Sequence, residues 1–156
     1  SCVERMVVVD IGPKAYPSHH QHIIDAMKSL NLLELGSRTE ADRAIEVYLK
    51  DWGIRQFLLK NLEWNSDKQL GWRCNLPVLA ASMSRIGKPL GPLDNFVGAC
   101  LFVRGLESDY LRDEDWPGIV KHFPAAQLES VAGAGHWVHA EQPQAFQLAV
   151  GSFLKS

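Results

Sequence analysis

Three stretches of the sequence end in side chains that can exchange a proton or orient a group that does. In chain order these side chains are Asp10, Ser108, Asp109 and His136. A carboxylate that orients an imidazole, which in turn activates a nucleophile, needs such groups to converge. Taken one at a time, each also fits a structural role, because an aspartate can close a turn and a histidine can lie at the surface of a glycine loop.

His136 is the sharpest of these candidates. Gly133 and Gly135 allow a tight turn before it, and a helix predicted from Pro143 anchors the chain after it. An imidazole titrates near neutral pH, so this side chain could act first as a general base and then as a general acid.

Other chemical motifs are incomplete in this sequence. The histidines His19, His20 and His22 have no nearby cysteine or acid pair to complete a ligand set, so we expect no metal. No phosphate-binding glycine motif opens a helix after a strand, and we expect no cofactor. The sequence also lacks Gly-x-Ser-x-Gly, the usual surround of a hydrolase serine.

The candidates depend on a sheet to bring them together. A continuous apolar run rich in β-branched residues predicts a buried strand over Met6–Asp10, and a second buried strand is predicted over Ala99–Val103. A third strand is predicted over Gln127–Ala132. Helices are predicted over Asp113–Phe123 and from Pro143 onwards. This alternation predicts the α/β class with a parallel sheet, whose strands end at one edge.

The stretch from 13 to 95 has a different pattern. Apolar residues recur at helical spacing in three places: near 18–33, after a capping box at Ser37–Glu40, and over Ile54–Leu62. A loop with a short strand is predicted over 64–75, a short helix follows near 77–86, and no clear sheet strand is present. We therefore expect a helical cap, with domain ranges of 1–12 for the first core strand, 13–95 for the cap and 96–156 for the remaining core.

Composition narrows the class of function. The 156 residues are 46% hydrophobic and 22% charged, with a net charge of −2, which excludes a nucleic-acid binder that works through bulk charge. No apolar stretch is long enough for a membrane span. The three cysteines are far apart and lack a Cys-x-x-Cys pair, so we expect reduced thiols and a cytoplasmic protein.

A specific motif surrounds His136. Gly135, His136, Glu141 and Pro143 match the pattern Gly-His, four residues, Glu, one residue, Pro, and here the sequence resembles the histidine loop of α/β-hydrolases. Residues 8–13 resemble strand six of that fold, and residues 101–105 resemble strand seven. Residues 57–60 and 73–77 resemble the cap of small bacterial esterases of the YbfF type.

The resemblance also assigns the acid. Most α/β-hydrolases place it three residues after the glycine of strand seven, a position held here by Ser108. In the YbfF-type branch it comes from the end of strand six, which implies that Asp10 is the orienting carboxylate. Ser108 would then support it by hydrogen bonding, and Asp109 is the alternative acid.

The resemblance covers only the carboxy-terminal part of the family's fold, so the nucleophile serine is expected outside this chain. It implies an esterase or thioesterase of short acyl substrates, whose pocket includes Phe57, Leu58, Trp64 and Trp137, with Trp52 a further possibility. We expect the edge of the first strand to be covered by the missing half of the hydrolase or by a homodimer mate. The alternatives are a non-catalytic binding module and another α/β-hydrolase chemistry, namely C–C hydrolysis, haloperoxidation or acyl transfer.

Overall fold

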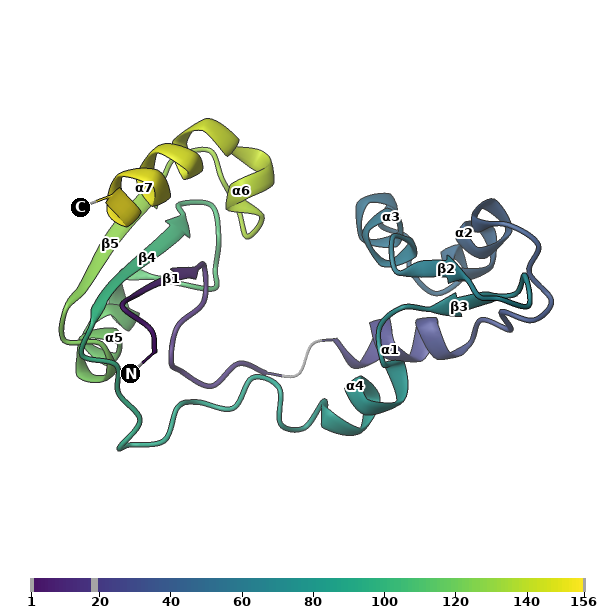
Figure 1. Cartoon of the computed structure of the whole chain (residues 1–156), viewed down its shortest axis with the longest axis horizontal. Coiled ribbons are helices and arrows are strands. Elements are labelled where there is room, and N and C mark those ends of the chain that lie inside the picture. The colour runs from purple at the N-terminus through teal and green to yellow at the C-terminus, as the bar shows by residue number, and fades with distance from the viewer. Residues whose placement is uncertain (1, 18–19, 156) are drawn as a thin grey trace. The chain divides into compact units, whose positions relative to one another are not determined.

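A computed structural model describes residues 2–17 and 20–155, and the chain divides into two compact units (Figure 1). The sheet unit consists of Ser1–Ala15 and Pro89–Ser156, and the helical unit of Tyr16–Lys88. Each unit has a hydrophobic core formed by its own residues.

The sheet unit is built on three parallel strands, β1 (Arg5–Val9), β4 (Ala99–Gly105) and β5 (Ala126–Val131), in the order β1-β4-β5. Val7 lies opposite Leu101, and Leu101 lies opposite Gln127. β1 and β4 form where the sequence is mainly apolar, whereas β5 combines apolar and polar residues. The α/β class predicted from the alternating pattern is therefore confirmed.

Helices cover both faces of this sheet (Figure 1). Odd-numbered residues of β1 and β4, such as Val7 and Val103, pack with Phe153 of α7 (Pro143–Lys155). Even-numbered residues, such as Phe102, pack with Ile119 of α5 (Trp116–His122). Both faces of β1 and β4 are covered, which explains why these two strands appear in the sequence as mainly apolar runs.

Two short elements join the strands to these helices. The 3-10 helix η1 (Asp113–Asp115) precedes α5, and α6 (Val138–Glu141) precedes α7. Proline occupies the first turn of α5, where its missing N–H costs nothing.

The helical unit contains α1 (Gln21–Lys28), α2 (Arg38–Glu46), α3 (Trp52–Leu59) and α4 (Leu76–Ser82). Three of these helices begin at a side-chain cap, since Ser37, Asp51 and Asn75 each accept a hydrogen bond from a backbone amide of the first turn. Their apolar residues form one core around Ile45, Leu62 and Leu70.

The helical unit contains a two-stranded sheet, of which the sequence predicted only one short strand, within 64–75. Leu62 belongs to β2 (Leu62–Trp64), which pairs antiparallel with β3 (Leu70–Trp72), so the predicted third helix extends too far. The side chain of Asn65 accepts hydrogen bonds from the amides of Asp67 and Gln69 and closes the turn of this hairpin. The predicted first helix is also shorter in the structure, over Gln21–Lys28.

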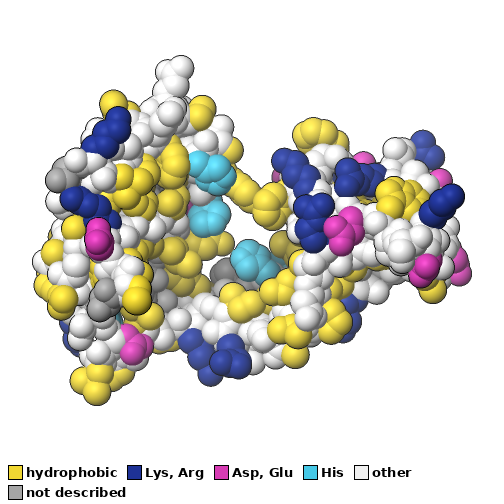
Figure 2. Space-filling model, viewed as in Figure 1, with side chains coloured by type: hydrophobic (Ala, Val, Ile, Leu, Met, Phe, Trp, Pro, Cys, Tyr) yellow, Lys and Arg dark blue, Asp and Glu magenta, His cyan; other side chains and the backbone are white. Residues whose placement is uncertain are grey.

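Apolar side chains remain at the surface of both units (Figure 2). Among the described residues, no helix is long and apolar enough to span a membrane. Within the same residues β1 pairs only with β4, so its other side is a sheet edge, and all five of its residues are half-buried.

The core of the helical unit generates a stability prediction. Ile45 is fully buried at the end of α2, whereas the neighbouring Val47 is 70% exposed. Ile45→Ala should lower the free energy of unfolding by about 2–5 kcal/mol, because it leaves a cavity. Val47→Ala, the matched control, should change it by less than about 0.5 kcal/mol. Urea denaturation measures both, and equal losses would show that this core is assigned wrongly.

Candidate active site

The candidate residues gather where the three parallel strands end. Asp10 directly follows β1, Ser108 lies in the loop after β4, and His136 lies in the loop after β5. The carboxyl edge of a parallel sheet is where ligands bind in open α/β folds.

Asp10 is the centre of this cluster. Its side chain is fully buried. Oδ1 accepts a hydrogen bond from the amide of Gly105 at 3.3 Å, and Oδ2 accepts one from the hydroxyl of Ser108 and one from Nδ1 of His136 at 2.8 Å. A buried carboxylate without such donors would be costly, so this arrangement is built to hold a negative charge.

The backbone of Asp10 is unusual as well. Its φ is +48°, in the left-handed region, although it is not a glycine. Its amide donates to the carbonyl of Val103 at 2.8 Å, so the residue is still tied to β4 when it turns. This conformation turns the chain away from the sheet directly after β1, and such outliers cluster at functional sites.

His136 binds the carboxylate of Asp10 through one nitrogen of its ring. Because a carboxylate only accepts, Nδ1 must carry the proton that Asp10 binds, which leaves Nε2 as the basic nitrogen. The side chain is 43% exposed. The ring of Tyr110, which no sequence pattern singled out, stacks on the imidazole, and the ring of Trp137 meets it edge-on.

The loop that carries His136 is held by a carboxylate that the motif contains. Glu141 accepts hydrogen bonds from the amides of Gly135, at 2.7 Å, and Trp137, at 3.2 Å. These two amides flank His136, so Glu141 fixes the backbone on both sides of the imidazole. The spacing of the histidine-loop motif thus has a physical reason.

A glycine at the end of β4 allows this loop to approach. A Cβ on Gly105 would collide with the carbonyl oxygens of Ala134 and Gly135. The amide of Glu107 also donates to the carbonyl of Ala134 at 2.9 Å. The loops after β4 and β5 are therefore in direct backbone contact.

The structure separates the two acids that the sequence left in competition. Asp109 is 87% exposed and its carboxylate binds the guanidinium of Arg112 at 2.8 Å. Its side chain therefore points away from the buried cluster, whereas Asp10 binds both Ser108 and His136.

The residues predicted to line an acyl pocket differ in exposure. Phe57, Trp64 and Trp52 are 46%, 52% and 66% exposed, and Trp137 is 40% exposed. Leu58 instead packs into the core of the helical unit and is only 8% exposed.

The described residues contain neither a cluster that could hold a metal ion nor an activated thiol at Cys100. Among the described residues, no three His, Cys, Asp or Glu side chains gather as a metal site would require, and His19 of the sequence cluster lies outside them. Burial raises the pKa of the Cys100 thiol to about 11, so this cysteine stays protonated at neutral pH and is not a nucleophile.

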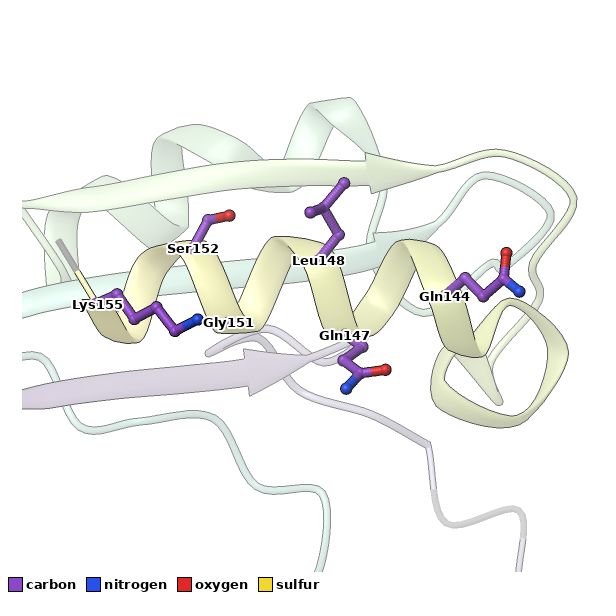
Figure 3. A pocket seen from close by; sticks show the side chains of 6 residues that line it. All are labelled: Gln144, Gln147, Leu148, Gly151, Ser152 and Lys155. Carbon is purple, nitrogen blue, oxygen red and sulfur yellow. The ribbon is translucent and has the colours of Figure 1, made fainter.

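The surface of α7 carries a hollow of about 320 Å³ that lies apart from these residues (Figure 3). Its lining consists mainly of amide, hydroxyl and aliphatic groups, from Gln144, Gln147, Leu148, Gly151, Ser152 and Lys155. None of the four candidate residues contributes to it.

Comparison with known proteins places this geometry in a family. A scan against models of protein families finds no match. A Mus musculus protein named sn-1-specific diacylglycerol lipase ABHD11 is 39% identical, over 97% of this chain and 51% of its own length. Esterase YbfF of Escherichia coli is 30% identical, over 97% of this chain and 58% of its own.

A solved structure agrees with these relatives. A marine microorganism esterase is 34% identical and superposes with a TM-score of 0.90, covering 97% of this chain and 60% of that one. The chain belongs to the α/β-hydrolase superfamily, where it corresponds to the carboxy-terminal part of its relatives. It spans about half the length of the curated relatives that it matches.

The contact between the two loops generates a second prediction. Gly105→Ala should destabilise the protein by about 1–3 kcal/mol, because the new methyl group must displace backbone atoms. Gly151→Ala is the matched control, since a Cβ there meets nothing within 4 Å and lies in a helix. It should be neutral or stabilise by up to about 1 kcal/mol. Urea unfolding compares them, and a neutral Gly105→Ala would contradict the close approach.

Proposed function

We propose that this chain supplies the histidine and the acid of a serine hydrolase that cleaves carboxylic esters. The observation that carries the proposal is the buried carboxylate of Asp10, held 2.8 Å from Nδ1 of a half-exposed His136 at the carboxyl edge of the sheet. A carboxylate, an imidazole and a serine hydroxyl form the triad of such enzymes.

The proposed mechanism assigns each proton. Nε2 of His136 takes the proton of the serine hydroxyl as its oxygen attacks the ester carbonyl, and the imidazolium then gives that proton to the departing alkoxide. Water then attacks the acyl-enzyme, with Nε2 of His136 again accepting a proton and returning it to the serine oxygen, and the carboxylic acid product is released. Asp10 holds Nδ1 protonated throughout and stabilises the imidazolium, while Ser108 and the amide of Gly105 support the carboxylate.

The nucleophile would come from a polypeptide segment outside this chain. The sequence has no Gly-x-Ser-x-Gly, and the chain spans about half of its relatives. The same segment, or alternatively a second copy of this chain, would pair with the outer edge of β1. Two observations support that pairing: among the described residues β1 pairs in the sheet only with β4, and all five of its residues are half-buried.

Short acyl esters or thioesters are the proposed substrates. Relatives named esterase and diacylglycerol lipase support an ester bond as the target. The exposed rings of Phe57 and Trp64 in the helical unit, and separately that of Trp137 in the sheet unit, are candidates for contacts with an acyl chain, whereas Leu58 is buried in the helical core. The free cysteines agree with the expected cytoplasmic location.

The choice of acid can be tested in the complete hydrolase. Asp10→Asn should lower kcat by on the order of 10⁴-fold, because an amide favours the wrong imidazole tautomer. Asp109→Asn, the matched control one residue from Ser108, should leave kcat within about threefold. The hydrolysis of p-nitrophenyl esters measures both, and the reverse order would make Asp109 the acid.

The place of the nucleophile can be tested with this chain itself. The chain alone should not hydrolyse p-nitrophenyl acetate above background. Adding a segment that carries Gly-x-Ser-x-Gly, in the same polypeptide or as a separate piece, should give turnover that His136→Ala abolishes. Turnover by the chain alone would refute an external serine. A restored fold that binds ester but does not cleave it would favour the non-catalytic module.

A further inference from the structure

The aromatic ring of Tyr110 stacks on the imidazole of His136. The centroid of the Tyr110 ring lies 4.0 Å from that of His136, and the two planes are inclined by only 21°. We infer that Tyr110 is a positioning residue for His136, whose flat ring fixes the plane of the imidazole for proton transfer. The kinetic effect expected from this inference rests on the proposed function, whereas the contact between the two rings does not.

Tyr110 is part of the same turn that supports the acid. Its backbone amide donates to the hydroxyl of Ser108 at 3.1 Å, and that hydroxyl donates to Asp10. One short segment thus binds the carboxylate through Ser108 and packs on the imidazole through Tyr110. The next residue, Leu111, is 2% exposed and is anchored in the core beside α5.

Ion pairs hold the remainder of this loop. Arg104 of β4 donates to the hydroxyl of Ser130 at 2.9 Å and to Asp113 at 2.5 Å. Asp115 accepts from the amide of Arg112 at 2.9 Å and from the ammonium of Lys14 at 2.5 Å. Partial burial alone would raise the pKa of Asp115, but these donors outweigh it and lower the pKa below its usual value.

A single hydrogen bond still allows the imidazole ring to rotate, so a second restraint is needed to fix its orientation. The bond from Nδ1 to Asp10 fixes one atom of the imidazole, about which the ring can still tilt and carry Nε2 away from the serine. A stacked ring removes this freedom, and offset stacking contributes about 0.5–1.5 kcal/mol beyond the buried area. The face of Tyr110 also attracts the imidazolium that forms during turnover.

The contact is tested by NMR on this chain, without any assay of activity. The imidazole C–H resonances of His136, assigned by their loss in His136→Gln, should lie upfield because of the Tyr110 ring current. Tyr110→Phe should keep this shift, whereas Tyr110→Leu, which keeps bulk but not the ring, should abolish it. Tyr110→Met provides a second non-aromatic variant if the leucine variant does not fold. Unchanged resonances in a folded non-aromatic variant would overturn the inference.

The consequence for catalysis is tested in the complete hydrolase. Tyr110→Leu should lower kcat by about 10- to 100-fold with KM within about threefold, because a misplaced imidazole slows proton transfer and not binding. Tyr110→Phe should restore kcat to within about threefold of the parent. Equal kcat in the parent and the leucine variant, or equal losses in the leucine and phenylalanine variants, would overturn the positioning role. If His136→Ala stays active, the proposed function fails instead, and the NMR result still decides whether Tyr110 orients the ring.

Discussion

A fully buried carboxylate organises the sheet unit, because its charge must be met by donors from separate parts of the chain. The amide at the end of β4, a hydroxyl from the loop after it and an imidazole from the loop after β5 all converge on Asp10. Removal of any donor would leave part of a buried charge unpaired, which proteins tolerate poorly. The turn after β1 and the packing of the loops after β4 and β5 therefore serve one purpose, which is to bring donors to the carboxylate of Asp10. The register of the sheet serves the same purpose.

The sheet, and the edge at which the candidate residues meet, could be predicted because both depend on local signals. Continuous apolar runs mark strands that are covered on both faces, and parallel strands must end at one edge. The place of His136 at that edge follows from this rule alone. The choice between Asp10 and Asp109 does not follow from it, since both lie near strand ends, and only the family resemblance favours Asp10 in the sequence. The fold adds that Asp10 is buried and binds His136, whereas Asp109 is exposed and binds Arg112.

The features that the sequence did not predict depend on contacts between distant residues. A short strand was predicted within 64–75, where β3 lies, but its pairing with β2 was not, because three residues in each strand are too few for an alternating pattern. The stacking of Tyr110 on His136 joins residues 26 positions apart, and no local spacing encodes it. Glu141 is a different case, because the motif contains this residue but does not explain its spacing. The fold explains it, since the carboxylate of Glu141 accepts hydrogen bonds from the amides of Gly135 and Trp137.

The points where the chain leaves and re-enters the sheet unit are neighbours. The amide of Leu90 donates to the carbonyl of Pro13 at 3.0 Å, and within the helical unit the amide of Tyr16 donates to the carbonyl of Gly87 at 2.8 Å. Each unit thus closes its own chain ends with a backbone hydrogen bond. Because these bonds close both ends of the helical unit, residues inserted into or removed from it need not change the register of β1 against β4.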